Sequence, residues 1–193
     1  VTDNSGNTST CASTVTVQDN VAPVATCKNI TVQLNSSGTA TIAAADINNG
    51  SSDACGIASL SASKTSFDCT NIGANTVVLT VTDNNGNTST CASTVTVQDH
   101  VAPVATCKNI TIQLNSAGTA SIVAADINNG SSDACGIASL AASKTSFNCT
   151  NIGANTVVLT VTDNNGNTST CASTVTVQDN VDAQRSEEHT SEL

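Results

Sequence analysis

An internal repeat of 80 residues constrains this sequence more than any other feature. Residues 21–100 and 101–180 differ at only seven positions, and residues 1–20 nearly match the last twenty of each copy. Self-similarity at a fixed period is typical of tandem arrays in which one folded unit recurs along the chain. The sequence therefore predicts the C-terminal end of a truncated module at 1–20 and two whole modules, at 21–100 and 101–180.

The chain departs from this pattern after residue 180. The string RSEEHTSEL at 185–193 contains every Glu and the only Arg of the chain, whereas Asp is the only acid elsewhere. It resembles the translation of a common short-read sequencing adapter. We therefore expect 181–193 to combine a remnant of the repeat with an artificial end, 185–193, that is no part of the natural protein.

Apolar and polar residues alternate along several segments of each module. Residues 30–34 have the sequence Ile-Thr-Val-Gln-Leu, and residues 77–81 also place an apolar residue at every second position. Clusters of Asn, Ser, Asp and Gly separate such runs, and no segment shows a helical period. The pattern predicts an all-β fold of tandem modules, each an immunoglobulin-like β-sandwich.

The apolar core of each module is expected to be small, because Phe67 and Phe147 are the only aromatic residues. Nine cysteines in 193 residues supply another source of stability. Disulfides persist in oxidising compartments and are rare in the cytosol. We therefore expect disulfide-stapled modules at an extracellular or cell-surface location.

Each whole module contains four cysteines, and Cys11 is the equivalent of Cys91 in the incomplete first copy. We therefore expect Cys11 to be unpaired because of truncation. Four cysteines allow three connectivities, and the sequence leaves all of them open. The favoured pairing joins the first strand of a module to its last and closes a local loop, as Cys27–Cys91, Cys55–Cys69, Cys107–Cys171 and Cys135–Cys149. Each such bridge contributes roughly 3–5 kcal/mol.

The charge and the residue content exclude several classes of function. A formal net charge of −10 with five Lys or Arg leaves no basic surface for nucleic acid or for an anionic membrane. No apolar run is long enough for membrane insertion. Within the repeats, no histidine accompanies a Cys or Ser nucleophile, no glycine-rich phosphate loop is present, and Asp68 is replaced by Asn148 in the second copy. The sequence therefore predicts that the chain is not an enzyme.

Two loops rich in Asp and Asn in each module are candidate calcium sites, since calcium prefers oxygen ligands. They lack the spacing of an EF-hand, and a hairpin turn and a solvated loop account for them without a metal. A third alternative joins these loops to Asp19, Asp99 or Asp179 at the module junctions, where calcium would stiffen the array. The candidate ligands are Asp46, Asp53, Asp83, Asn85, Asp99, Asp126, Asp133, Asp163 and Asp179. No other cofactor is expected.

Three motifs occur together in the module. They are Val-Ala-Pro-x-x-x-Cys from Val21, Val-Thr-Asp-Asn-x-Gly-Asn-Thr-Ser-Thr-Cys from Val81, and the closing Thr-Val-Thr-Val. In combination they resemble the hyalin repeat (HYR) family and the similar immunoglobulin-like repeats of large bacterial surface proteins. The resemblance covers residues 1–179. It implies an immunoglobulin-like sandwich, a bridge between the first and last cysteines of each module, and a role in extracellular adhesion.

These observations predict an extracellular structural or adhesive repeat array of a secreted or surface-anchored bacterial protein. The alternative is a set of inert spacer modules that carry a catalytic or binding domain located elsewhere in the protein. The expected partners are neighbouring modules of the same chain and an extracellular glycan or protein ligand. The scarcity of aromatic residues leaves few side chains for stacking on sugars, which favours the spacer.

Overall fold

A computed structural model describes residues 1–180, and the predictions for 181–193 and 185–193 lie outside the described residues. The described chain forms two compact units. The first comprises Val1–Thr31, Thr41–Thr65 and Ala74–Thr96, and the second comprises Val32–Ala40, Ser66–Gly73 and the chain from Val97 on. The second unit therefore contains the whole second repeat and the part of the first repeat around Cys69. The module boundaries at residues 21 and 101 stay a prediction.

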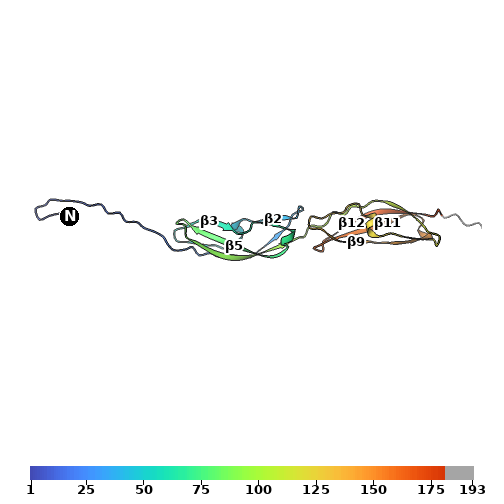
Figure 1. The fold of residues 1–193 in the computed structure, drawn as a ribbon, viewed down its shortest axis with the longest axis horizontal. Coiled ribbons are helices and arrows are strands. Elements are labelled where there is room, and N and C mark those ends of the chain that lie inside the picture. Colours follow the sequence, from blue (N-terminus) through green and yellow to red (C-terminus); the bar gives the residue numbers. More distant parts are fainter. Residues whose placement is uncertain (181–193) are drawn as a thin grey trace, which may run out of the picture. The chain divides into compact units, whose positions relative to one another are not determined.

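The second repeat contains a four-stranded sheet and a two-stranded sheet (Figure 1). Its strands are β7 (Ile110–Gln113), β8 (Thr119–Ser121), β9 (Ile137–Ala142), β10 (Ser146–Asn148), β11 (Gly153–Asp163) and β12 (Thr168–Gln178). The larger sheet has the order β7-β12-β11-β9, and β8 pairs with β10. The long strands β11 and β12 are antiparallel, whereas β7 runs parallel to β12.

The first repeat has the same strand order. Its larger sheet is β1-β6-β5-β3, and β2 pairs with β4. The bounds are Ile30–Gln33, Thr39–Thr41, Ile57–Ala62, Ser66–Asp68, Gly73–Asp83 and Thr88–Gln98 for β1 to β6. Both repeats are immunoglobulin-like β-sandwiches, so the predicted all-β fold with an 80-residue period is confirmed.

Each repeat also contains two short helical segments that the sequence analysis did not predict. The α-helices are α1 (Ala44–Ile47) and α2 (Ala124–Ile127), and the 3₁₀ helices are η1 (Cys69–Asn71) and η2 (Cys149–Asn151). A single turn is too short to show a helical period, and only Ile47 and Ile127 are buried in it. Within residues 1–180, no helix is long and apolar enough to cross a membrane.

The core of the second repeat follows the period-two alternation of its long strands. Val157, Leu159 and Val161 of β11 are fully buried, and Val175 and Val177 of β12 join them. Each buried side chain of this size stabilises the fold by about 1.5–3 kcal/mol. The intervening positions are less buried, with Val158 at 37% exposure and Thr160 and Thr176 half-buried, so the alternation determines which face of the sheet points inward.

The disulfides differ in part from the predicted pairing. Cys27 is bonded to Cys91 and Cys107 to Cys171, as expected for a bridge between the first and last cysteines of a module. The predicted pairs Cys55–Cys69 and Cys135–Cys149 do not form, and Cys69 is bonded to Cys135 instead. Within residues 1–180, the free cysteines are Cys11, Cys55 and Cys149, all of them exposed.

The length of β11 explains why the second pair does not close within a repeat. Cys135 lies at the C-terminal end of β11, where the Nδ2 of Asn164 donates to its carbonyl oxygen at 2.7 Å. Cys149 precedes the N-terminal end of the same strand, at Gly153. Eleven residues of strand span about 35 Å, whereas the two Cα atoms of a disulfide lie within about 7 Å. The equivalent cysteines of the first repeat make the same local contacts, with Asn84 and Gly38.

Candidate functional site

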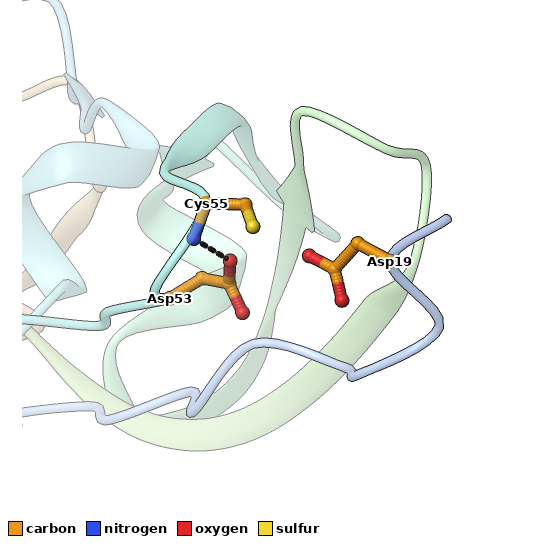
Figure 2. A group of neighbouring side chains, drawn as sticks. All are labelled: Asp19, Asp53 and Cys55. Carbon is orange, nitrogen blue, oxygen red and sulfur yellow. Dashed lines mark hydrogen bonds between the residues drawn. The ribbon is translucent and has the colours of Figure 1, made fainter. Parts of the chain in front are cut away.

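Two aspartates and one cysteine gather at equivalent places in the two repeats. In the first repeat these are Asp19, Asp53 and Cys55, which we call the Cys55 cluster. Their carboxylate oxygens and sulfur lie within 4.8 Å of one another. Figure 2 shows both carboxylates and the Cys55 sulfur facing the same space. The cluster joins the loop after α1 to the segment that precedes Val21.

Local hydrogen bonds place these side chains. The Oδ1 of Asp53 accepts from the backbone N–H of Cys55 at 2.7 Å, and the Oδ1 of Asp19 accepts from that of Val21 at 3.0 Å. The Nδ2 of Asn87 donates to the carbonyl oxygens of Asp19 and Val21, at 3.1 and 3.2 Å. The hairpin that carries Asn87 therefore holds the Asp19 segment beside the Cys55 loop.

The two carboxylates keep the Cys55 thiol protonated. A hydrogen bond to Asp19 and the negative charge of Asp19 are the main causes that raise the pKa of Cys55, with smaller effects of burial, Asp53 and Asp83. Only a thiolate is a strong nucleophile or a ligand for soft metals. The carboxylate oxygens of the cluster are therefore suited to a hard cation, and its thiol should react slowly as a nucleophile.

The second repeat repeats this geometry with Asp99, Asp133 and Cys135, which we call the Cys135 cluster. Asp99 is only 6% exposed, and its Oδ1 accepts from the backbone N–H of Val101 at 3.0 Å. Its Oδ2 is buried and has no hydrogen-bond partner among the described residues. The sulfur of Cys135 is held in the bond to Cys69, so two carboxylates remain for a cation. Calcium takes six to eight oxygens, so most would have to come from the backbone or water.

The candidate ligands of the hairpin loops serve the turn itself. The Oδ1 of Asp83 accepts from the backbone N–H groups of Asn85 and Asn87, and its Oδ2 accepts from the Nδ2 of Asn87, all at 2.8 Å. Burial raises the pKa of Asp83, but these hydrogen bonds outweigh it, so the pKa lies below its ordinary value. Asp163 has the same partners and the same direction of shift. These contacts favour the hairpin alternative over a calcium loop.

The remaining candidate ligands lie apart from the two clusters. The Oδ2 atoms of Asp46 and Asp126 accept from the backbone N–H groups of Ala43 and Val123, each at 2.8 Å, and so cap α1 and α2. Asp179 is the equivalent of Asp19 and Asp99 and is exposed. The structure thus unites Asp53 with Asp19 and Asp133 with Asp99, as the third alternative expected. Whether calcium binds there stays a prediction.

Pockets lie beside both clusters. The pocket next to Cys55 holds about 470 Å³ and is lined by Asp19, Val21, Ala22, Val24, Ser52, Asp53, Ala54 and Cys55. The equivalent pocket of the second repeat holds about 310 Å³, and Ser36 of the first repeat forms one of its walls. The same surface is therefore open in one repeat and partly covered in the other.

The bond between Cys69 and Cys135 is the site feature that sequence reasoning missed. Each repeat contains one equivalent of Cys69 and one of Cys135. The number and spacing of cysteines are therefore the same whether this pair closes within one repeat or between two. The available signal was the long alternating run from Gly73 to Asp83. A strand of this length begins near Cys69 and ends in a hairpin whose Asn84 donates a hydrogen bond to Cys55, so it keeps the two cysteines apart.

No protein-family model and no curated protein matches the chain. Among solved structures, cadherin domains 1–4 of protocadherin gamma B7 share 11% identity, with a TM-score of 0.40, over 82% of this chain and 51% of that one. The chain thus spans about half the length of that structure. Domains 1–2 of human mucin-like protocadherin match at 13% identity and a TM-score of 0.35, over 79% and 96% of the two chains.

The fibronectin(III)-like modules of Clostridium thermocellum CbhA match at 12% identity and a TM-score of 0.30, over 89% of this chain and 97% of that one. Likenesses this remote carry no argument about function. The function must therefore be inferred from the residues of this chain.

Proposed function

We propose that this chain is a load-bearing segment of an extracellular structural array, built from HYR-like modules of a bacterial surface protein. The observation that carries the proposal is the pattern of three disulfides. One disulfide closes each of the two sandwiches, and the third joins Cys69 of one repeat to Cys135 of the next. Consecutive repeats are therefore connected twice, by the main chain and by a covalent bridge.

This pattern limits how far the chain extends under tension. Each bridge within a sandwich encloses a sequence separation of 64 residues, which would otherwise extend by about 220 Å. The bridge between repeats adds a second path for force beside the short segment from Cys91 to Cys107. Resistance to extension is what a stalk requires, and oxidising conditions outside the cell preserve such bridges.

The surface supports a structural role more than direct binding by the modules. Both aromatic residues, Phe67 and Phe147, are 2% exposed and belong to the cores. No aromatic side chain within the described residues is therefore available to stack on a sugar. This observation favours the second candidate function, an inert spacer, over an adhesin, and we propose that the modules themselves catalyse no reaction.

Single-molecule force spectroscopy on the 193-residue chain tests the load-bearing role. Without reductant, we expect neither repeat to release its enclosed residues. With reductant, each repeat should lengthen by about 220 Å more on unfolding. The paired variant Cys69→Ser with Cys135→Ser keeps both inner bridges and should yield at lower force. Full extension without reductant would contradict the proposal.

A binding assay separates the structural role from adhesion. Beads that carry many copies of the chain are washed over glycans, matrix proteins and cells, because weak contacts add up at high valency. We expect no retention at any density of the chain. Retention that depends on density would assign adhesion to the modules themselves.

A further inference from the structure

The sequence contains four Asn-Gly pairs, two in each repeat. They are Asn49-Gly50 and Asn85-Gly86 in the first repeat, and Asn129-Gly130 and Asn165-Gly166 in the second. In such a pair the backbone nitrogen of the glycine can attack the side-chain carbonyl carbon of the asparagine, because glycine has no Cβ to obstruct the approach. All eight residues are exposed, so water reaches the four pairs alike. The hydrogen bonds around each glycine nitrogen therefore decide which pairs react.

The backbone N–H of Gly50 has no hydrogen-bond partner among the described residues. Gly50 has a φ of 79°, and a Cβ on it would meet no atom within 4 Å. On one side, the N–H of Asn49 donates to the carbonyl oxygen of Thr26 at 2.8 Å. On the other side, the N–H of Ser51 donates to the Oδ1 of Asn48 at 3.0 Å. The glycine nitrogen is therefore open between two anchored neighbours, and we call Asn49-Gly50 and its equivalent in the second repeat the open pairs.

The second repeat has the same arrangement at Asn129-Gly130. Gly130 has a φ of 78°, and a Cβ on it would also meet no atom within 4 Å. Its N–H makes no hydrogen bond in the part of the chain that the structure describes. The N–H of Asn129 donates to the carbonyl oxygen of Thr106 at 2.8 Å. The open pair is therefore a property of the repeat, because both copies have it.

The glycine N–H of the hairpin pair Asn85-Gly86 is held by Asp83. It donates to the carbonyl oxygen of Asp83 at 3.3 Å. The same N–H also interacts with the Asp83 carboxylate and is one cause of the lowered pKa of that group. The backbone N–H groups of Asn85 and Asn87 donate to the Oδ1 of Asp83, both at 2.8 Å. The glycine nitrogen must break a hydrogen bond before it attacks, and the neighbouring negative charge opposes the loss of its proton.

The hairpin of the second repeat holds Asn165-Gly166 in the same way. The N–H of Gly166 donates to the carbonyl oxygen of Asp163 at 3.3 Å, and the N–H of Asn165 donates to the Oδ1 of Asp163 at 2.8 Å. We call Asn85-Gly86 and Asn165-Gly166 the held pairs. The chain therefore presents one dipeptide in two environments, and each environment occurs twice.

We propose that Asn49 and Asn129 are modification sites, at which the side-chain amide is converted spontaneously to a carboxylate with release of ammonia. Their co-substrate is water, and the reaction requires no enzyme, metal or oxidant. The held pairs consist of the same two residues and are protected from this reaction. Deamidation at the open pairs is independent of the load-bearing role proposed above, so either can fail without the other.

The reaction has two steps and consumes one molecule of water. In the first step, the Gly50 nitrogen loses its proton to solvent and bonds to the Cγ of Asn49. The bond from Cγ to Nδ2 breaks, and Nδ2 takes up a proton and leaves as ammonia, which completes a succinimide ring. In the second step, water adds to one of the two ring carbonyl carbons. Opening at Cγ gives aspartate, and opening at the main-chain carbonyl carbon gives isoaspartate.

The modification changes both the charge and the backbone of the loop. Each event adds a negative charge to a chain whose formal net charge is already −10. In isoaspartate, the main chain runs through the former side chain of Asn49, so it becomes longer between the two anchored neighbours. The residue that anchors Asn49 is Thr26, which directly precedes the disulfide-bonded Cys27. We therefore expect a weaker contact at Thr26 and an intact disulfide.

Peptide mapping of the 193-residue chain by mass spectrometry tests the inference. The chain is incubated in heavy-oxygen water at neutral pH and physiological temperature, once in buffer and once in concentrated urea with its disulfides reduced. Heavy oxygen in a new carboxylate marks an event that occurred during the incubation. A methyltransferase specific for isoaspartate provides a second measure of the product.

In buffer, we expect the open pairs to be modified about tenfold faster than the held pairs, a factor of the order that one backbone hydrogen bond provides. In the unfolded chain the four rates should converge, because the dipeptide is the same. Equal rates at the open and held pairs of the folded chain would overturn the inference. So would open pairs that stay unmodified in buffer while the unfolded chain reacts.

The variant Asp83→Asn tests the protection of a held pair, and Asn165 in the same molecule is its matched control. The substitution removes the negative charge beside the Gly86 nitrogen and keeps a side-chain oxygen that accepts the hydrogen bonds of the turn. The rate at Asn85 should rise several-fold, whereas the rates at Asn165 and Asn49 should not change. An unchanged rate at Asn85 would contradict protection by the hairpin carboxylate.

Discussion

Residues 8–18 and strand β6 (Thr88–Gln98) have the same eleven-residue sequence and different structures. In β6, Val95 and Val97 are 0% and 1% exposed, whereas their equivalents Val15 and Val17 are 83% and 91% exposed in a segment that forms no strand. The 193 residues contain no earlier copy of the strands that flank β6. Alternation therefore specifies which face of a strand is apolar, but neighbouring strands decide whether the strand forms.

The turns that precede these two segments, in contrast, have the same structure in both copies. Asp3 accepts hydrogen bonds from the backbone of Ser5 and Asn7 and from the side chain of Asn7, at 2.8–2.9 Å. Asp83, the last residue of β5, makes the same set of bonds in the turn that leads into β6. A turn of five residues contains all its own partners, so it forms in both places while the strand forms in only one.

The largest difference in stability is expected when the equivalent valines of residues 8–18 and of β6 are replaced by aspartate. Val95→Asp buries a carboxylate without a partner and should destabilise the first repeat by about 4 kcal/mol or more. Val15→Asp places the same charge in water and should leave the unfolding midpoint unchanged. Chemical denaturation of both variants measures the difference. Equal midpoints would mean that residues 8–18 are packed as β6 is.

Substituting the cysteines should produce almost as large a difference in stability between the complete first repeat and the incomplete copy at residues 1–20. Cys27→Ser with Cys91→Ser opens a bridge with a sequence separation of 64 residues, and the chain-entropy estimate gives a loss of about 4 kcal/mol. Cys11→Ser removes the equivalent of Cys91 and should have no effect, because Cys11 is free. Calorimetry under non-reducing conditions provides the comparison. A loss of stability in the Cys11→Ser chain would show that Cys11 has a partner after all.

The same contrast explains how much could be predicted from the sequence. The strands follow from the alternation inside one repeat, and the bond from Cys27 to Cys91 was the favoured one of several pairings and the one that the family resemblance implies. The link from Cys69 to Cys135 depends on a neighbouring repeat, and no count of cysteines within 80 residues distinguishes it from a local bridge. The predicted local loop from Cys55 to Cys69 ignored β5, which follows Cys69 and ends beside Cys55, so that its length separates the two cysteines in space.

The candidate calcium ligands divide for a similar reason. Asp83 and Asp46 find their partners within four residues, so their roles in a turn and a helix cap were available from local sequence. The approach of Asp53 to Asp19 is not local, and only the place of Asp19 at a module junction suggested it. The sequence provides little indication that Asp99 is buried, because its equivalent Asp19 differs in its immediate neighbours only by Asn20 in place of His100 and is less buried.

A smaller effect is expected from acid. The pKa of Asp83 is lowered in the folded state, so its charge stabilises the fold above the unfolded pKa of about 3.9. This contribution is lost as the pH falls through the folded value. Asp83→Asn should therefore lower the melting temperature by a few degrees at neutral pH, and the difference from the unaltered chain should shrink toward pH 3 (about one unit below the reference pKa).

Asp3→Asn is the matched control for this prediction. The pKa of Asp3 is also lowered, chiefly by hydrogen bonds from the side chain and backbone of Asn7. Its turn adjoins a segment whose valines are exposed, so the substitution should leave the melting temperature unchanged at every pH. A pH-dependent shift equal to that of Asp83→Asn would show that the first turn unfolds together with the core.

The smallest expected effect distinguishes the Cys55 and Cys135 clusters. The buried Oδ2 of Asp99 has no hydrogen-bond partner among the described residues, whereas Asp19 is less buried. With a dissociation constant near 10⁻³ M (of the order found in extracellular modules), about 1 mM calcium should raise the melting temperature by roughly 2 °C over EDTA. Asp99→Asn should abolish that increment, and Asp19→Asn should preserve most of it. Equal midpoints in calcium and EDTA would mean that the paired carboxylates serve the loops and hold no metal, so that the Cys69–Cys135 disulfide and the main chain would connect consecutive repeats without help from an ion.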